Sequence, residues 1–383
     1  MTLLPCVADL SLIDHHCHGV VRTDLNRAEF ESLLTEADAA SPLGTSLFDS
    51  LIGLAVRRWC APVLDLPPHA SADDYLARRA ELGATEVNRR FLAASGTSDL
   101  LVDGGFQPER LTSLDELASL SGKATHEIVR LETLAEDVVH AGTTAADFAT
   151  HCASALATHG SAVGCKSIAA YRVGLRLAGS RPTGAEVRAA AGRWLSDAAR
   201  AGHVRLADET LHRFLIWLAI DQRLPVQFHV GLGDADLDLA ECDPLLLTGL
   251  LRATRETGVP ILLLHNYPFH RNAAYLAQVF PHVFVDIGLA THNAGRRGGA
   301  LVAELLEIAP FGKVLYSSDA FGLAEHYYLG ARQFRSGLSE FLAVGLADDS
   351  WTPTDAEHIA ELIGQQNARR AYAFRLSNER SVN

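Results

Sequence analysis

Short apolar runs that alternate with longer amphipathic stretches are the feature that most constrains how this chain can fold. Runs of this kind, each bounded by turn residues, lie at Leu12–His18, Leu100–Asp103, Ile128–Glu132, Ala162–Ala170, Pro225–Gly231, Pro260–Asn266, His282–Gly288 and Lys313–Asp319. Strands that alternate with helices are typical of βα units and a parallel sheet. Eight strands with intervening helices predict an α/β fold, a (β/α)8 TIM-like barrel.

The residues that end these runs indicate where the chemistry of such a barrel would lie. The active site of a (β/α)8 barrel is built at the C-terminal ends of its strands. In this chain the runs end in His16 and His18, Asp103, Glu132, Lys166, His229, His265 and Asp319. The sequence therefore predicts a barrel mouth lined by polar and metal-binding side chains.

The composition narrows the class of partner and the compartment. The 383 residues carry 33 basic and 46 acidic side chains, a net charge of −13. Such a surface repels phosphates, so we expect a small-molecule partner and no nucleic acid or membrane, with a homo-oligomer contact left open. No run approaches the ~18 apolar residues of a membrane span, and no signal-type segment is evident, so we expect a cytoplasmic protein. The sparse cysteines, without a C-x-x-C pair, predict free thiols that lie mostly in the core.

The chain is longer than the ~250 residues of a typical barrel, and the gaps between runs locate the surplus. We expect a single barrel domain over residues 1–383, with a helical insertion over residues 19–99. Helical spacing within and after this insertion predicts helices at Ala28–Asp38, Leu47–Trp59, Ala72–Ala94, Gly184–Ala201, Leu211–Arg223 and Thr354–Phe374. Long inserts at the catalytic face shape the pocket or an oligomer contact, and Trp59 or Phe91 would anchor this one.

The tripeptide His16-Cys17-His18 presents two metal ligands from one strand. Residues i and i+2 of a strand share a face, so both imidazoles are expected inside the barrel. His15 and Cys17 would then point outward, toward the helices.

Three further residues fit the same interpretation. His229 and His265 end buried runs, where an imidazole without a partner is costly, and Asp319 ends the last run. A divalent cation would supply that partner, although satisfied core histidines remain the alternative. Imidazole with carboxylate suits Zn²⁺ best, with Mn²⁺ or Fe as alternatives, and an open coordination position lowers the pKa of bound water toward ~7.

These positions carry a resemblance to a known family. With H-x-H on the first strand, histidines on the fifth and sixth and an aspartate on the eighth, the chain resembles the metal-dependent amidohydrolase superfamily. The segments Gly164–Arg172, Gln227–Asp238 and Tyr316–Ala320 look like its amidohydrolase-2 branch, including the amidohydrolase half of FluG and nodulin-like fusions to glutamine synthetase. The resemblance runs from about residue 10 to about residue 375 and implies a hydrolase, with decarboxylases as close relatives.

The resemblance leaves two states open for Lys166. In binuclear relatives a lysine on the fourth strand carries a carbamate that bridges two metals. If Lys166 is carbamylated, two ions would be shared among His16, His18, His229, His265 and Asp319. Without a carbamate, one ion is expected and His265 would polarise the substrate instead. A lysine that pairs with an aspartate or glutamate beside the site, for example Glu132, is the structural alternative.

Two residues are candidates for substrate recognition. Arg172 could bind a substrate carboxylate with two parallel N–H hydrogen bonds, with a helix-capping or ion-pair role as its alternative. His292 could point into the mouth, with a surface position as its alternative. The acidic residues at 234, 236 and 238 do not form a calcium loop, because Leu239 stands where such a loop needs glycine. They would bind a substrate amine or cap a helix.

The leading hypothesis is an enzyme, a metal-dependent amidohydrolase that cleaves an amide or related C–N or ester bond of a small polar metabolite. Water activated by the metal would attack the carbonyl, Asp319 would carry the proton, and the metal or His265 would stabilise the oxyanion. A γ-glutamyl amide is a substrate candidate by family analogy only. A metal-dependent decarboxylase and a non-catalytic binding protein on the same barrel are the alternatives.

Overall fold

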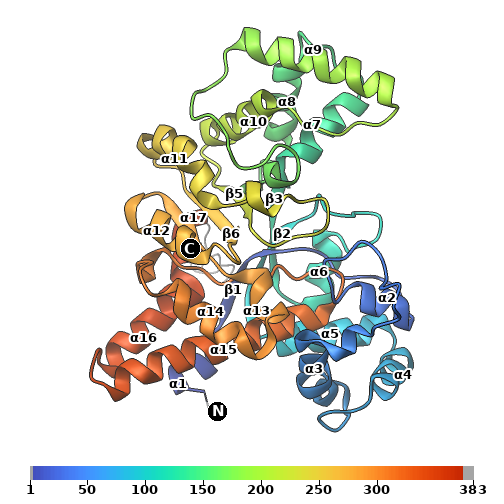
Figure 1. Ribbon diagram of the computed structural model, residues 1–383, viewed down its shortest axis with the longest axis vertical. Coiled ribbons are helices and arrows are strands. Elements are labelled where there is room, and N and C mark those ends of the chain that lie inside the picture. Colours follow the sequence, from blue (N-terminus) through green and yellow to red (C-terminus); the bar gives the residue numbers. More distant parts are fainter. Residues whose placement is uncertain (1–2, 374–383) are drawn as a thin grey trace, which may run out of the picture.

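The computed structural model describes residues 3–373 and contains one parallel sheet. Its seven strands follow one another in chain order and curl around a common interior (Figure 1). They are β1 (Leu12–Cys17), β2 (Thr97–Asp103), β3 (Ala124–Arg130), β4 (Gly164–Ser167), β5 (Val226–Val230), β6 (Ile261–His265) and β7 (Val283–Val285). The predicted parallel α/β barrel is confirmed.

The eighth predicted run, Lys313–Asp319, closes the ring without forming a regular strand. A parallel bridge joins Val314 to Val285 of β7. On the other side, the His15 N–H donates to the Tyr316 carbonyl at 3.1 Å, and the Asp319 N–H donates to the β1 backbone at 3.0 Å. The positive φ of 51° at Asp319 interrupts the extended backbone, which accounts for the missing ladder.

The segment between β1 and β2 is helical, with shorter helices than the sequence predicts. It contains α2 (Arg27–Ser32), α3 (Leu51–Ala55), α4 (Ala72–Leu82) and α5 (Ala84–Ala94). The single helix predicted over 72–94 is wrong, because Gly83 adopts a positive φ of 77° and divides it. Ser71 starts α4 as predicted by accepting a hydrogen bond from the Asp74 N–H.

The predicted aromatic anchors of this segment differ in their surroundings. Phe91 is fully buried, and its ring centroid lies 6.0 Å from that of Tyr328 on α15 (Ala324–Ala347). Trp59 is only partly buried and stacks between the guanidinium groups of Arg58 and Arg332, at 4.0 Å and 3.4 Å from its ring centroid. Phe91 therefore anchors the segment to the barrel.

The remaining helices surround the sheet. In Figure 1, α7 to α10 form a layer at one end of the molecule, and α2 to α5 lie at the opposite end. The bounds are α1 (Pro5–Ala8), α6 (Leu114–Ser121), α7 (Leu131–His140), α8 (Phe148–Thr158), α9 (Gly184–Ala201), α10 (Glu209–Asp221), α11 (Thr248–Thr254), α12 (His270–Val279), α13 (Gly288–Asn293), α14 (Gly298–Leu305), α16 (Pro353–Glu361) and α17 (Asn367–Tyr372). None of the helices within residues 3–373 has the length and apolarity needed to cross a bilayer.

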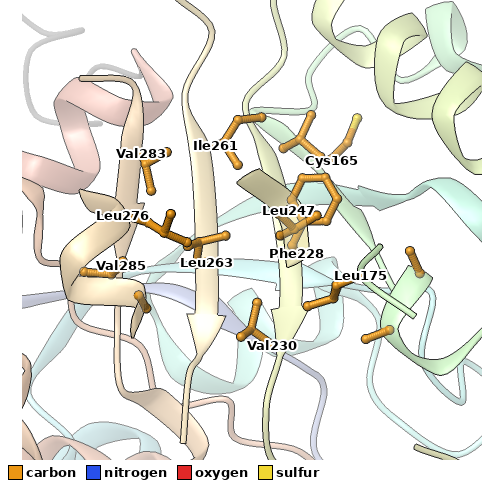
Figure 2. Close-up of a cluster of buried hydrophobic side chains, with 14 of the residues drawn as sticks. Cys165, Leu175, Phe228, Val230, Leu247, Ile261, Leu263, Leu276, Val283 and Val285 are labelled. Carbon is orange, nitrogen blue, oxygen red and sulfur yellow. The ribbon is translucent and has the colours of Figure 1, made fainter. Parts of the chain in front are cut away.

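Alternating strand residues build two apolar layers. Those that face outward pack under the helices, as Figure 2 shows for Phe228, Ile261, Leu263 and Val285. Those that face inward fill the bottom of the barrel, where α17 adds Tyr372; they include Ile13, Leu101, Ile128, Leu262, Leu264 and Leu315. The cysteines are free thiols, and all except the partly buried Cys6 are buried, as predicted. The apolar floor leaves the strand ends as the place for polar groups.

Candidate active site

The predicted ligands meet at the C-terminal mouth of the barrel. The Nε2 atoms of His16 and His18 lie 3.1 Å and 3.5 Å from Asp319 Oδ1. His265 Nδ1 lies 3.4 Å from Asp319 Oδ2, and the His229 and His265 ring centroids are 4.7 Å apart. Ligand atoms of His16, His265 and Asp319 all fall within 4.8 Å of one another. Atoms this close can share one ion at ligand distances of about 2 Å.

Several buried ring nitrogens of this cluster lack partners in the described structure. His229 and His265 are 5% and 1% exposed. Within the described part of the chain, His16 Nδ1, His229 Nε2 and His265 Nε2 have no hydrogen-bond partner. A buried polar atom left unpaired costs about 1–3 kcal/mol. Imidazole nitrogens grouped around a carboxylate suit a divalent cation such as Zn²⁺, so the residues present fit such an ion.

The electrostatics keep the cluster in the state that binds a cation. Burial lowers the pKa of His16 to about 4, and the neighbouring Lys166 charge adds to this. A neutral imidazole is the form that ligates metal. Burial alone would raise the pKa of Asp319, but His265 and His16 beside it hold that pKa well below its ordinary value. Asp319 is therefore a carboxylate.

Backbone irregularity directs two of these side chains. In β6, Leu263 packs outward and Leu264 inward, so regular alternation would turn His265 outward. His265 instead has a positive φ of 67°, and its N–H donates to Asp286 Oδ1 at 2.8 Å. Asp319 also has a positive φ, 51°. Such conformations are uncommon for residues other than glycine and concentrate at functional sites.

A register shift in β1 corrects one prediction. The pairing of β1 with β2 shifts between Asp14 and Cys17, which is a bulge that places two consecutive residues on one side. His15 therefore points into the barrel, not outward as predicted. Its Nε2 lies 2.9 Å from Asp286 Oδ2, and its Nδ1 lies 2.9 Å from the Tyr372 hydroxyl.

Lys166 is buried at the centre of the cluster. Its Nζ lies 3.1 Å from His16 Nε2. Burial lowers the pKa of Lys166 to about 8, against the opposing charges of Asp319 and Asp103. A lowered pKa increases the share of neutral amine, which is the form that carbamylation requires.

The alternative pairing of Lys166 with Glu132 is wrong. Glu132 lies beyond the end of β3, in the first turn of α7. Its Oε1 accepts hydrogen bonds from the Ser167 hydroxyl at 2.8 Å and from a backbone N–H at 3.0 Å, and it lies 3.1 Å from His212 Nδ1. Glu132 therefore supports the end of β4 from outside.

A pocket of about 220 Å³ opens onto the cluster. Arg172 lines it; its Nη1 lies 3.1 Å from Glu136 Oε1, and its buried Nε has no partner among residues 3–373. The remaining wall is made by His18, Glu36, Phe106, Arg130, Lys166, Ile168, Tyr171, Arg205, His229, Asp234, Asp236, His265, Leu289, Asp319 and Phe321.

The structure also bears on the predictions for His292 and for the acidic residues at 234, 236 and 238. His292 is 1% exposed, so its surface alternative is wrong, and its ring stacks on His326 with centroids 4.7 Å apart. It lies one turn after the pocket residue Leu289 without lining the pocket itself. Asp238 caps a short helix by accepting from the Ala240 N–H at 3.0 Å, as the capping alternative predicts.

Sequence reasoning missed several pocket residues, among them Glu36 and Tyr171. Glu36, from the insertion, lines the pocket, which confirms that part of this segment reaches the mouth. The Tyr171 ring centroid lies 4.6 Å from that of His229. Glu36 lies within the helix predicted over Ala28–Asp38, but α2 ends at Ser32, so helical spacing does not set its position. Tyr171 lies just after the β4 run, so its position past a strand end was the available signal.

A parallel α/β barrel with histidines and a carboxylate converging at its C-terminal mouth defines a class of metal-dependent barrel enzymes. The chain belongs to the amidohydrolase family, whose model matches residues 173–374. It is 29% identical over 401 residues to the protein FluG of Emericella nidulans, and the match covers 94% of this chain and 45% of FluG. The chain thus spans less than half the length of this curated relative.

Solved structures agree with this assignment. A "putative metal-dependent hydrolase" from Lactobacillus casei ATCC 334 matches with a TM-score of 0.82 and 30% identity over 98% of both chains. A uronate isomerase from Bacillus halodurans C-125 matches with a TM-score of 0.67 over 97% of this chain and 95% of its own. Its identity of 14% supports likeness of fold alone.

Proposed function

We propose that this chain is a metal-dependent hydrolase that cleaves an amide, related C–N or ester bond of a small polar metabolite. The observation that carries the proposal is the group of buried, unpaired histidine nitrogens around Asp319 at the base of a pocket. Its family and its likeness to the L. casei protein support the same reading. A γ-glutamyl amide remains a candidate substrate by analogy.

The metal would be Zn²⁺, with Mn²⁺ or Fe as alternatives. One ion would be held by His16, His18, Asp319 and either His229 or His265; a carbamate on Lys166 would make room for two. When bound, such an ion acts as a Lewis acid and lowers the pKa of water toward neutrality.

The chain's own residues would divide the remaining work. Asp319, held as a carboxylate, accepts a proton from the attacking water at one of its oxygens and returns it to the leaving group. His265, if it does not ligate, donates a hydrogen bond to the oxygen that becomes negative. Arg172 binds a substrate carboxylate through its unpaired Nε. Phe106 and Phe321 on the pocket wall limit the entry of bulk water.

Metal-dependent decarboxylation is the second candidate. The guanidinium groups of Arg130 and Arg172 beside the cluster would orient a substrate carboxylate, which is what this reaction needs. Asp319 or a histidine would then protonate the carbon.

The test uses purified protein loaded with Zn²⁺, Mn²⁺ or Fe²⁺, with the metal content per chain measured. A panel of small amides, esters and carboxylic acids is incubated in H₂¹⁸O, and the products are analysed for ¹⁸O and for CO₂. Incorporation of ¹⁸O supports the hydrolase, whereas release of CO₂ without ¹⁸O in the product supports the decarboxylase. Protein that binds no metal, or that binds metal and turns over nothing in the panel, counts against both and favours a binding protein. Asp319→Asn serves as the inactive control.

A further inference from the structure

The charged groups of the pocket are mostly neutralised in pairs. Three arginines line it, and each has an acidic partner within ion-pair distance. The pairs are Arg130 with Asp103 at 2.6 Å, Arg172 with Glu136 at 3.1 Å, and Arg205 with Asp236 at 2.7 Å. Among the pocket acids outside the metal cluster, these pairs neutralise Asp236 but not Glu36 or Asp234.

Glu36 and Asp234 are the pocket carboxylates outside the metal cluster that have no cationic partner in the part of the chain that the structure describes. Asp234 Oδ1 accepts the N–H of Asp236 at 3.0 Å, a contact within its own loop. Burial raises the pKa of Glu36 to about 8, and the charges of Asp319 and Asp234 add to this. A cation placed between the two acids would remove that penalty.

Both acids lie on the side of the pocket formed by Tyr171. After burial, the charges of Asp234 and Glu36 are the largest causes that raise the pKa of the Tyr171 hydroxyl. The same loop touches the unpaired histidine nitrogen, because a Cβ on Gly233 would lie 3.0 Å from His229 Nε2. His229 is only 5% exposed, and its Nε2 has no hydrogen-bond partner among residues 3–373. The loop that carries Asp234 therefore adjoins the histidine nitrogen where a ligand would bind, and Glu36 lines the same pocket.

The arginines form the complementary side. Arg130, Arg172 and Arg205 line the same pocket; burial lowers the pKa of Arg172 against the Glu136 charge, and the Arg205 and Arg130 charges lower it further. Arg172 keeps a buried Nε without a partner in the described residues. Within residues 3–373, the pocket thus offers an unpaired guanidinium N–H for an anion and two acidic groups without a cationic partner for a cation.

Resting on the proposed function, we infer that Glu36 and Asp234 bind a substrate ammonium group while Arg172 binds a carboxylate. The substrate would then carry an amino-acid head group, and the bond to be cleaved would lie toward the histidine cluster. The pocket volume of about 220 Å³ suits a molecule of this size. Glu36 belongs to the insertion, so the insertion would supply part of the specificity.

The test compares ligands that differ only in the ammonium group. L-Glutamate and glutarate, and separately L-aspartate and succinate, are titrated by calorimetry into the Zn²⁺-loaded protein. We expect at least one amino acid to bind about tenfold or more tightly than its partner without the amine, as a desolvated charged hydrogen bond of about 1.5–3 kcal/mol implies. Glu36→Gln should reduce that ratio to near one, and Asp234→Asn should reduce it in the same direction. Glu307→Gln, which changes an acid paired with Arg271 outside the pocket, should leave the ratio unchanged.

Equal or tighter binding of the diacids, binding of neither ligand of each pair, or a ratio that survives Glu36→Gln in folded protein would overturn the inference. Thermal unfolding of each variant establishes that it is folded. Metal content and ¹⁸O incorporation decide the proposed function independently, because neither depends on the ammonium group.

Discussion

Two neighbouring residues, His15 and His16, lie in the same barrel in opposite chemical situations. Both ring nitrogens of His15 are within 2.9 Å of a partner, Asp286 Oδ2 and the Tyr372 hydroxyl. Gln227 extends this network by donating to Tyr372 at 2.7 Å. His16 instead belongs to the mouth cluster: its Nδ1 has no partner in the described structure, and its Nε2 faces Asp319 and Lys166.

The difference teaches how to separate a structural histidine from a ligand. The network around His15 is satisfied by the protein itself, so it stabilises the barrel floor against α17. The mouth cluster is unsatisfied, and it coincides with positive φ angles at His265 and Asp319. Unpaired atoms and backbone strain together mark a site prepared for something from outside.

The largest expected effects concern the mouth. His16→Ala should lose both bound metal and turnover, because it removes a ligand. Asp319→Asn should keep most of the metal but lower turnover by at least ~10²-fold, because the amide keeps one ligand oxygen and loses the proton carrier. Metal analysis and kcat with any identified substrate check this. Near-normal turnover of Asp319→Asn would contradict the proton-transfer role.

The next prediction compares the stability and the metal content of one variant from each environment. His15→Leu should lower the free energy of unfolding of the metal-free protein by about 3 kcal/mol, because it leaves the Asp286 carboxylate buried without its partner. His229→Leu removes an unpaired nitrogen and should change it by less than about 1 kcal/mol. Urea unfolding measures both. Metal content should show the reverse pattern: His15→Leu should keep its metal per folded chain, and His229→Leu should bind less metal. Equal destabilisation by both variants would break the comparison.

A pH profile sharpens the same contrast. The pKa of His16 is lowered to about 4 in the fold, while an unfolded histidine titrates near ~6.5. Below pH ~6.5 His16 takes up a proton in the unfolded chain but stays neutral in the folded chain. The free energy of unfolding therefore falls as the pH drops from ~6.5 toward 4. For this residue the loss in metal-free protein is about 1 kcal/mol at pH 5.5.

One carboxyl group acts against this trend. The pKa of Asp14 is raised to about 7, chiefly by burial, so its contribution to stability grows as the pH falls from ~7 to ~4. Chelator-treated His16→Leu should therefore show a flatter acid side than the parent protein, and Asp14→Asn a steeper one. Unfolding in urea at several pH values tests the pair, and identical profiles for the two variants would refute the assignment of these pKa values.

The sequence predicts which residues form the site better than it predicts the irregular backbone that directs their side chains. His16, His18, His229, His265 and Asp319 were identified because each ends an apolar run, and strand ends of a barrel meet at one mouth. The inward turn of His15 was missed because a bulge depends on pairing with β2 and leaves no mark in the local pattern.

Other features were missed for related reasons. Glu36 reaches the pocket from a segment that was predicted to be helical but is irregular after Ser32, so its periodicity gave the wrong position. The eighth strand run was found in the right place, but the φ of Asp319 that prevents a regular ladder is set by its surroundings at the mouth. Local patterns therefore predict elements, while contacts between distant segments decide side-chain direction.

The smallest expected effect comes from the insertion, which reaches the mouth and not the floor network. Replacing residues 37–44, which lie between Glu36 and the next short helix, by a Gly/Ser linker of equal length should raise KM about fivefold, about 1 kcal/mol of lost binding. Metal content and kcat should stay within twofold, because no histidine of the cluster is touched. Replacing the shorter segment 143–146, outside the pocket wall, by a Gly/Ser linker is the control for the substitution itself. An unchanged KM, or equal effects of both replacements, would mean that the insertion does not help to hold the substrate.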